Sequence, residues 1–262
     1  MRAGTIVGFA MTVWFSTLWA QAPQARDPLA TRGGWELGLQ AAAYRYEEPK
    51  FALWKGNRVG ATGSYTMLWP QYVYSRIEMR YSYGALDYTG SGTLSGVPDH
   101  LYELRAIIGQ DFRAGRVIWS PYVGVAYRQL YDDLRGTSST GARGYRRKSE
   151  YWYLPAGVTL RLPLGAEWIL APQIEYDAFA NGRQRSYLAD AGLGFSDVVN
   201  RQERGYGARA QLMLERRRWS FGLWAQYWKI KDSDIQPIGF GFVGLEPANN
   251  TRESGIELRY RF

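Results

Sequence analysis

The chain has 262 residues, with 32 Lys and Arg against 24 Asp and Glu, a net charge of +8, one histidine and no cysteine. The lack of cysteine excludes a disulfide framework, thiolate catalysis and cysteine-based metal sites, and a single histidine excludes a histidine-rich metal centre. We therefore expect no metal and no cofactor. Aromatic residues reach 16% although the mean hydropathy is −0.37, a combination that is unusual for a soluble domain.

The N-terminus has the pattern of a secretory signal peptide. Arg2 is followed by a largely apolar run without charge and then by Ala20-Gln21-Ala22, whose small residues suit a cleavage site. A transmembrane anchor would need a longer run. Because Pro23 should hinder cleavage after Ala22, we expect cleavage after Ala20. The sequence then divides into a signal peptide at 1–20, a polar periplasmic lead at 21–34 and one domain at 35–262.

Segments of strand length fill the rest of the chain. In 74–83, apolar and charged residues alternate, as in Ile77, Glu78 and Met79, and this period of two is that of a strand and not of a helix. About ten such segments are predicted, at 35–46, 58–69, 72–84, 100–112, 116–131, 149–162, 166–179, 204–215, 218–230 and 251–262.

The predicted connections alternate between short and long. The short ones lie at 70–71, 113–115, 163–165 and 216–217, and the long ones at 47–57, 85–99, 132–148, 180–203 and 231–250. Such an alternation places tight turns at one end of an up-and-down antiparallel sheet and long loops at the other. The last loop either extends the strands or folds inward as a cap.

The last segment, Gly255–Phe262, carries the most specific pattern. Ile256, Leu258, Tyr260 and Phe262 share one face, and charged residues occupy the other. This ending resembles the C-terminal strand of bacterial outer-membrane β-barrels, whose final aromatic residue is read by the barrel-assembly machinery. The resemblance implies an all-β transmembrane antiparallel barrel with the general architecture of omptin and opacity-type barrels. It also implies export to the bacterial outer membrane, contact with its lipid and lipopolysaccharide, and assembly through Phe262.

Aromatic residues agree with this architecture. An interfacial girdle is predicted near the short turns from Trp35, Trp69, Phe112, Trp119, Trp168, Trp219 and Phe262. A second girdle is predicted near the long loops from Tyr44, Tyr46, Tyr83, Tyr102, Tyr127, Tyr151, Tyr206 and Tyr227. Three prolines inside strands, Pro121, Pro155 and Pro172, leave eight or twelve strands as alternatives, because proline cannot donate to the ladder.

The faces opposite the apolar residues are rich in charge, and in a narrow barrel these faces meet in the lumen. We expect a network of ion pairs that plugs the barrel, and the alternative is a narrow porin-like channel with an anion bias. The predicted lumen residues are Arg76, Glu78, Arg80, Glu103, Arg105, Arg128, Glu175, Asp177, Arg209, Glu257 and Arg259.

The long loops carry clustered cations. Because guanidinium groups bind phosphate, sulfate and carboxylate bidentately, the loops are predicted to bind an anionic glycan, a host surface ligand or lipopolysaccharide phosphates. The candidate contacts are Arg135, Arg143, Arg146, Arg147, Lys148, Arg183 and Arg185. Nucleic-acid binding is not expected, since the basic residues are dispersed over a secreted membrane scaffold.

Enzymatic function is the less favoured alternative. Omptins use an Asp–Asp pair and an Asp–His pair, for which this chain offers Asp232 with Asp234 and Asp99 with His100. Adjacent strand residues point to opposite faces, so the second pair departs from the omptin pattern. A lipid-modifying hydrolase would need a serine beside His100, and none lies at a suitable spacing. The predicted function is therefore a non-enzymatic surface protein with ligand-binding loops.

Overall fold

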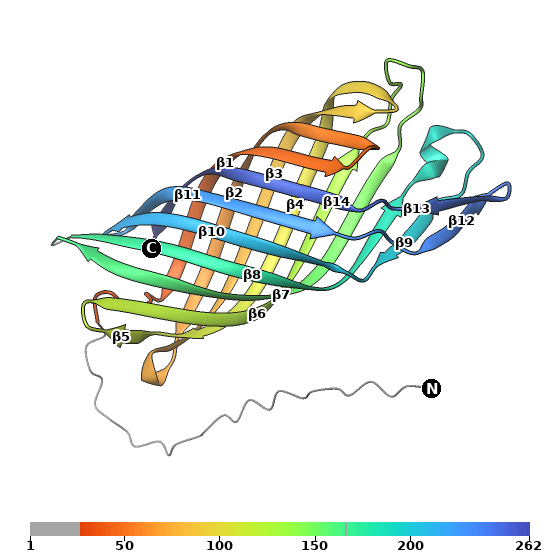
Figure 1. The fold of residues 1–262 in the computed structure, drawn as a ribbon. Helices are drawn as coiled ribbons and strands as arrows, with labels where there is room; N and C mark the ends of the chain where they lie inside the picture. The colour runs from red at the N-terminus through yellow and green to blue at the C-terminus, as the bar shows by residue number, and fades with distance from the viewer. Residues whose placement is uncertain (1–26, 166) are drawn as a thin grey trace, which may run out of the picture.

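Inward and outward residues alternate along nearly the whole chain in the computed structural model, which describes residues 27–165 and 167–262 (Figure 1). The predicted signal peptide lies outside the described residues. The structure contains ten long strands: β1 (Gly34–Glu48), β2 (Ala52–Leu68), β3 (Val73–Gly90), β4 (Gly92–Gln110), β6 (Val117–Asp133), β7 (Arg146–Leu164), β8 (Trp168–Ser186), β10 (Gly205–Arg216), β11 (Trp219–Ile230) and β14 (Asn249–Arg261).

Shorter elements complete the chain: β5 (Phe112–Ala114), β9 (Val198–Gln202), β12 (Ile235–Gly239), β13 (Phe242–Leu245) and the 3-10 turns η1 (Pro70–Tyr72) and η2 (Leu188–Ala191). Within the described ranges, no helix has the length and apolar character needed to cross a membrane.

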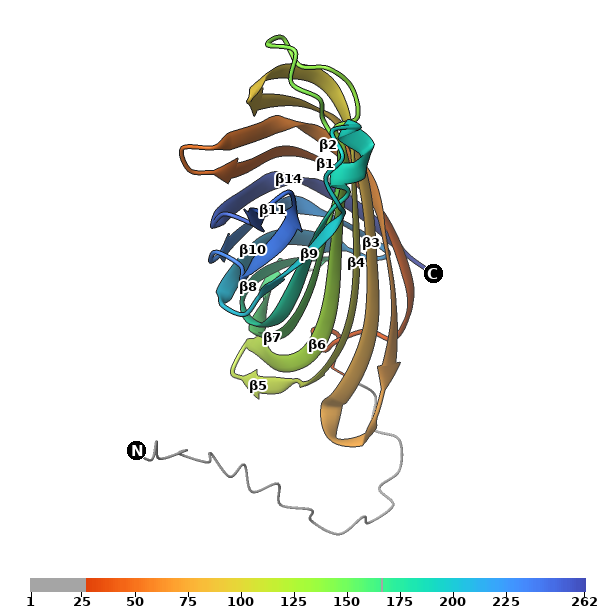
Figure 2. The ribbon, with the colours of Figure 1, turned by 90° about the vertical axis from the view of Figure 1, so that its right-hand side faces the viewer.

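The long strands form one closed antiparallel barrel. Each pairs with the next along the chain, and β14 returns to β1, from Glu36 opposite Arg261 to Glu47 opposite Asn250. Figure 2 shows the strands wrapping around a common axis. The prediction of an all-β antiparallel barrel is confirmed, with ten strands and not eight or twelve.

Two connections are shorter than predicted. β1 and β2 are joined by 49–51, and β3 and β4 by Ser91 alone, so the expected long loops at 47–57 and 85–99 are wrong. The β1–β2 and β3–β4 hairpins continue beyond the apolar band, and β2 and β3 still pair there, from Leu53 opposite Thr89 to Lys55 opposite Asp87. There the outward side chains become polar, as at Lys55 and Asp87, so the sequence alternation disappears while backbone pairing continues.

The three prolines that were predicted to lie inside strands, Pro121, Pro155 and Pro172, lie on the neighbouring strands β6, β7 and β8. Regular pairing between β6 and β7 is interrupted at Pro155, and pairing between β7 and β8 is interrupted opposite Pro172. Pro121 lies opposite Val158 within the β6–β7 pairing. The barrel therefore accommodates two of these prolines by local gaps in the ladder.

The outer wall carries an apolar band with aromatic residues near both borders. At the turn end, Trp35, Trp69, Trp119, Trp219 and Phe262 are exposed, and Trp168 is half-buried.

The predicted second girdle needs a correction. Tyr44, Tyr46 and Tyr151 are buried inside the barrel, because they share the inward parity of their strands. Tyr83, Tyr102 and Tyr206 point outward.

Candidate functional site

Ion pairs cross the middle of the lumen. Glu103 on β4 forms ion pairs with Arg80 from β3 at 3.1 Å and with Arg209 from β10 at 2.9 Å. Arg105 bridges Glu78 at 2.9 Å and Glu175. These side chains come from four different strands and are largely buried. The network therefore spans the interior from wall to wall.

Further polar contacts extend this network in both directions. Arg259 contacts Glu257 at 2.7 Å and Glu36 at 3.5 Å. Arg128 donates to Gln226 at 3.0 Å and lies over the ring of Trp228. The structure thus brings into one interior all the predicted lumen residues: Arg76, Glu78, Arg80, Glu103, Arg105, Arg128, Glu175, Asp177, Arg209, Glu257 and Arg259.

Only small spaces remain between these charges. Two neighbouring cavities among them have volumes of about 70 and 40 Å³, enough for a few waters each. At the turn end, Thr31 is buried and bonds Asp111 through its backbone N–H at 2.6 Å and its hydroxyl at 2.7 Å. The segment before β1 therefore contacts the lower end of the interior.

Sequence reasoning missed a second charged layer nearer the loops. Arg58 is fully buried between Asp99 and Glu253, and its guanidinium lies 3.4 Å from the centre of the Tyr44 ring. Arg58 has the same parity as the inward Thr62, so strand periodicity could have identified it. Asp99 was not predicted as a lumen residue, because the predicted loop at 85–99 was too long and included it.

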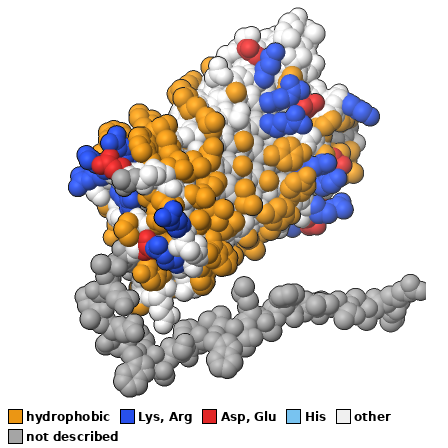
Figure 3. Space-filling model, turned by 60° about the vertical axis from the view of Figure 1, so that its left-hand side comes forward, with side chains coloured by type: hydrophobic (Ala, Val, Ile, Leu, Met, Phe, Trp, Pro, Cys, Tyr) orange, Lys and Arg blue, Asp and Glu red, His pale blue; other side chains and the backbone are white. Residues whose placement is uncertain are grey.

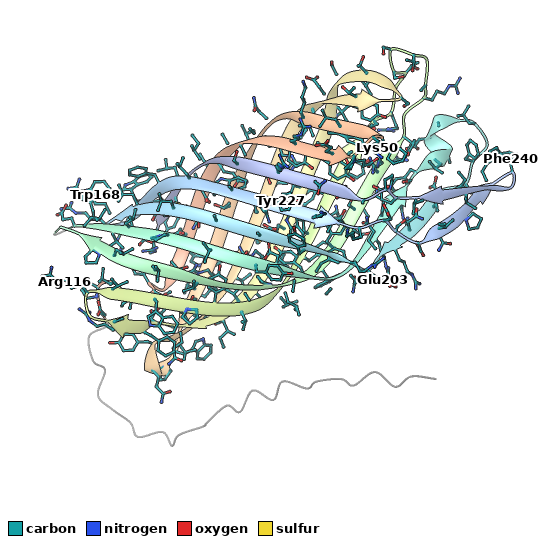
Figure 4. The ribbon with its side chains drawn as sticks, viewed as in Figure 1. Lys50, Arg116, Trp168, Glu203, Tyr227 and Phe240 are labelled. Atoms are coloured by element: carbon teal, nitrogen blue, oxygen red, sulfur yellow. The ribbon has the colours of Figure 1, made fainter. Side chains whose placement is uncertain are left out.

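Above this layer, the outer end of the barrel holds a cavity of about 360 Å³. Figure 4 places Lys50 and Phe240 at this end, opposite Trp168 and Arg116. The cavity is built from the β1–β2 and β3–β4 hairpins, the loops at 134–145 and 187–197, and the β12–β13 hairpin. Its mainly apolar and aromatic walls include Phe51, Trp54, Tyr88, Leu94, Leu134, Tyr145, Leu188, Val198, Ile238 and Leu245.

The cavity has a charged floor. The guanidinium of Arg147 contacts both Glu48 and Glu246, and lies 4.8 Å from the Trp54 ring centre. Tyr46 donates to the same carboxylates at 3.1 and 3.2 Å. Burial raises the pKa of Glu246 to about 7, opposed by Arg147 and reinforced by Glu48. Two carboxylates therefore share one cation in a buried setting.

The predicted loop cations do not form one exposed cluster. The expectation for Arg147 is wrong, because it lies in β7 at an inward position and is buried. Arg135 pairs with Asp133 at 2.7 Å, and Lys148 pairs with Glu150 at 3.1 Å.

The other predicted cations lie apart from these pairs. Arg146 pairs with Asp190 at 2.7 Å, and Arg143 donates to the Ala191 carbonyl at 3.3 Å. Arg183 and Arg185 are exposed but belong to β8 and not to a loop. Of these four cations, Arg146 is the one that forms an ion pair with a carboxylate among the described residues.

The residues weighed for catalysis are also separated. Asp99 is buried inside the wall, while His100 points outward and contacts the Tyr81 hydroxyl at 3.0 Å. Asp232 accepts the Ala248 backbone N–H. The described residues thus place Asp99 and His100 on opposite faces, and they contain no cluster of three potential metal ligands.

A closed ten-stranded barrel with a charged interior, an apolar outer band and aromatic borders has the architecture of an outer-membrane β-barrel. No family model and no curated protein matches the sequence. Among solved structures, the chain is similar to the outer-membrane protease OmpT of Escherichia coli, with a TM-score of 0.52 and 9% identity over 87% of this chain and 96% of that one.

Two further solved structures show weaker similarity. The translocator domain of the autotransporter NalP from Neisseria meningitidis gives a TM-score of 0.45 and 12% identity over 88% and 90% of the two chains. Neisserial surface protein A gives a TM-score of 0.36 and 11% identity over 87% of this chain and 97% of that one. At these identities the similarity concerns the fold.

Proposed function

We propose that this chain is an integral outer-membrane surface protein with a closed lumen, which binds a small cationic amphiphile in the cavity at its outer end. The observation that carries the proposal is the buried floor of that cavity, where Glu48 and Glu246 share the single guanidinium of Arg147. Beneath the cavity, ion pairs fill the lumen, and this supports a binding role rather than a diffusion channel.

The charge balance of the floor favours a cation. On the floor, two ionised carboxylates with one guanidinium leave an uncompensated negative charge, and burying such a charge is unfavourable. The other guanidinium that lines the cavity, that of Arg143, donates to the Ala191 carbonyl instead. The raised pKa of Glu246 reflects this penalty. A ligand ammonium group would supply the second positive charge, and aromatic faces such as those of Trp54 and Tyr88 also attract cations.

The walls favour an apolar body on the same ligand. Leu94, Leu134 and Val198 line the cavity beside the aromatic residues, and pockets with apolar walls and a few polar groups are typical small-molecule sites. This geometry supports a cationic ligand better than the anionic glycan expected from sequence, because Arg147 is buried and Arg135, Arg146 and Lys148 are each paired with a carboxylate.

Octylammonium and octanoate provide a matched pair of probes for the refolded barrel. Calorimetric titration should show binding of octylammonium and none of octanoate. Glu246→Gln should weaken octylammonium binding by roughly tenfold or more, since it removes a charge-assisted bond worth about 1.5–3 kcal/mol. Glu150→Gln, which changes a partly exposed carboxylate paired with Lys148, is the control and should bind as the wild type does.

The pH profile gives an independent test. Glu246 must lose its proton to attract the ligand, and its pKa is raised to about 7. The affinity for octylammonium should therefore be constant well above pH 7 and should fall as the pH decreases through 7. The decrease should approach tenfold for each pH unit. Equal binding of octanoate, or a pH profile that Glu246→Gln leaves unchanged, would contradict the proposed site.

A further inference from the structure

The outer aromatic border is interrupted on one side of the barrel. Outward aromatic residues mark this border on seven of the long strands, from Tyr83, Tyr102, Tyr127, Trp152, Tyr176, Tyr206 and Tyr227. On β14, β1 and β2 the outward residues approaching the loop end contain no aromatic. Small residues such as Ser254 and Ala43 occupy that region instead.

On β14 and β1 the interruption overlaps a depression in the lipid-facing wall. Small side chains on four adjacent strands leave a shallow hollow of about 650 Å³. Its outward-facing lining includes Ala43, Ala208, Ala210, Ala225 and Ser254. Aromatic girdles normally fill this level of a barrel, so the hollow exposes a recess at the boundary between hydrocarbon and headgroups.

A row of cations borders the recess on the loop side. Arg252 on β14, Arg45 on β1 and Lys55 on β2 are direct cross-strand neighbours, and all three are exposed. Figure 3 shows Lys and Arg side chains gathered at the outer border of the apolar band. Like charges directly opposite one another on adjacent strands are destabilising.

Nearby carboxylates of the described residues compensate only part of the positive charge of this row. Arg45 pairs with Glu47 at 3.0 Å, and Asp87 is the cross-strand neighbour of Lys55 on β3. Within the described ranges, no carboxylate lies at ion-pair distance from Arg252 or Lys55. The row therefore retains a positive excess at the level of lipid headgroups.

We infer that this wall of the barrel binds a phosphorylated glycolipid of the outer leaflet, that is, the lipid A part of lipopolysaccharide. Guanidinium groups bind phosphate bidentately, so Arg252 and Arg45 would hold a phosphate. The recess would accommodate the sugar and the first part of an acyl chain where an aromatic ring would otherwise lie. This site is separate from the cavity at the outer end and from the loop cations.

Native mass spectrometry of the refolded barrel with purified lipid A measures this binding directly. The double variant Arg45→Gln, Arg252→Gln should bind lipid A roughly 30-fold more weakly, which corresponds to about 1 kcal/mol for each cation near an anionic surface. The control is Arg116→Gln, Arg218→Gln, which removes two exposed cations at the turn end of the barrel and should leave binding unchanged. Heat-modifiable gel mobility verifies that all barrels are folded.

Two further probes separate the contributions. Dephosphorylated lipid A should bind the wild type as weakly as intact lipid A binds the double variant. Ala43→Trp should fill the recess and weaken lipid A binding while all charges remain. An equal loss of binding in the turn-end control would overturn the inference. Unchanged binding of dephosphorylated lipid A, or equally tight binding of phosphatidylglycerol, would also overturn it.

Discussion

The guanidinium of Arg58 is fully buried in the interior and depends on a small set of partners. Asp99 and Glu253 supply negative charge, and the Tyr44 ring covers its face. A buried ion pair has a large desolvation penalty that its partners must offset, so removing one partner is more damaging than removing a surface charge.

Arg58→Met should therefore destabilise the refolded barrel by about 3–5 kcal/mol, because it leaves Asp99 and Glu253 buried without this cation. Urea unfolding in detergent micelles measures the effect. Arg135→Met, which removes an exposed cation paired with Asp133, should change the stability by less than about 1 kcal/mol. A similar small change for Arg58→Met would show that water reaches the buried layer.

Strand parity correctly predicted which side chains point inward where the two faces of a strand differ in polarity. It placed Arg76, Glu78 and Arg80 inside and Ile77 and Met79 outside, as the structure does. Residue type alone does not distinguish an inward tyrosine from an outward one, because tyrosine suits both a lipid interface and a polar interior. Tyr44, Tyr46 and Tyr151 do share the inward parity of their strands, but the girdle prediction used their position near the strand ends and not their parity.

Among the elements, β12 and β13 form a hairpin that lies apart from the barrel sheet (Figure 1). Its attachment to β9 includes Asn200, whose amide nitrogen donates to the carbonyls of Asp234 at 2.8 Å and Gly244 at 3.1 Å. The hairpin contributes Ile238 and Leu245 to the cavity wall, so its position influences the shape of the cavity.

Asn200→Ala should release this hairpin without unfolding the barrel. The loss of two bonds to buried or half-buried carbonyls, at about 1–2 kcal/mol in total, should raise the opened population roughly tenfold. Chymotrypsin should then cleave at Phe240 or Phe242 about tenfold faster, while heat-modifiable mobility stays unchanged. Asn181→Ala, an exposed position on β8, is the control. Equal cleavage rates in both variants would show that other contacts hold the hairpin.

The ends of the elements were harder to predict than their existence. Inside the apolar band, the lipid requires alternation, and the segments predicted there match the strands. Above the band, water satisfies both faces, so hairpins such as β1–β2 continue without a sequence signal. The cavity could not be predicted because its walls come from five such segments, and their relative positions depend on tertiary packing.

At the scale of the whole molecule, closure of the barrel brings the charged faces of ten strands together in one interior. The membrane-level charges Arg80, Glu103, Glu175 and Arg209 form one network, and Arg58 with Asp99 adds a second layer above it. With spaces of only about 70 and 40 Å³ among the lower charges, a continuous path for solutes is not expected.

The refolded wild type should therefore give no stable conductance steps in a planar lipid bilayer, with insertion verified by heat-modifiable gel mobility. Replacing Arg80, Glu103, Glu175 and Arg209 together by serine removes two positive and two negative charges and leaves space for water. This variant should show small steps that increase with salt concentration. The matched loop variant Asp133→Ser, Arg135→Ser should remain silent. Salt-dependent steps in the wild type would instead favour a narrow channel, in which the inward arginines should produce anion selectivity.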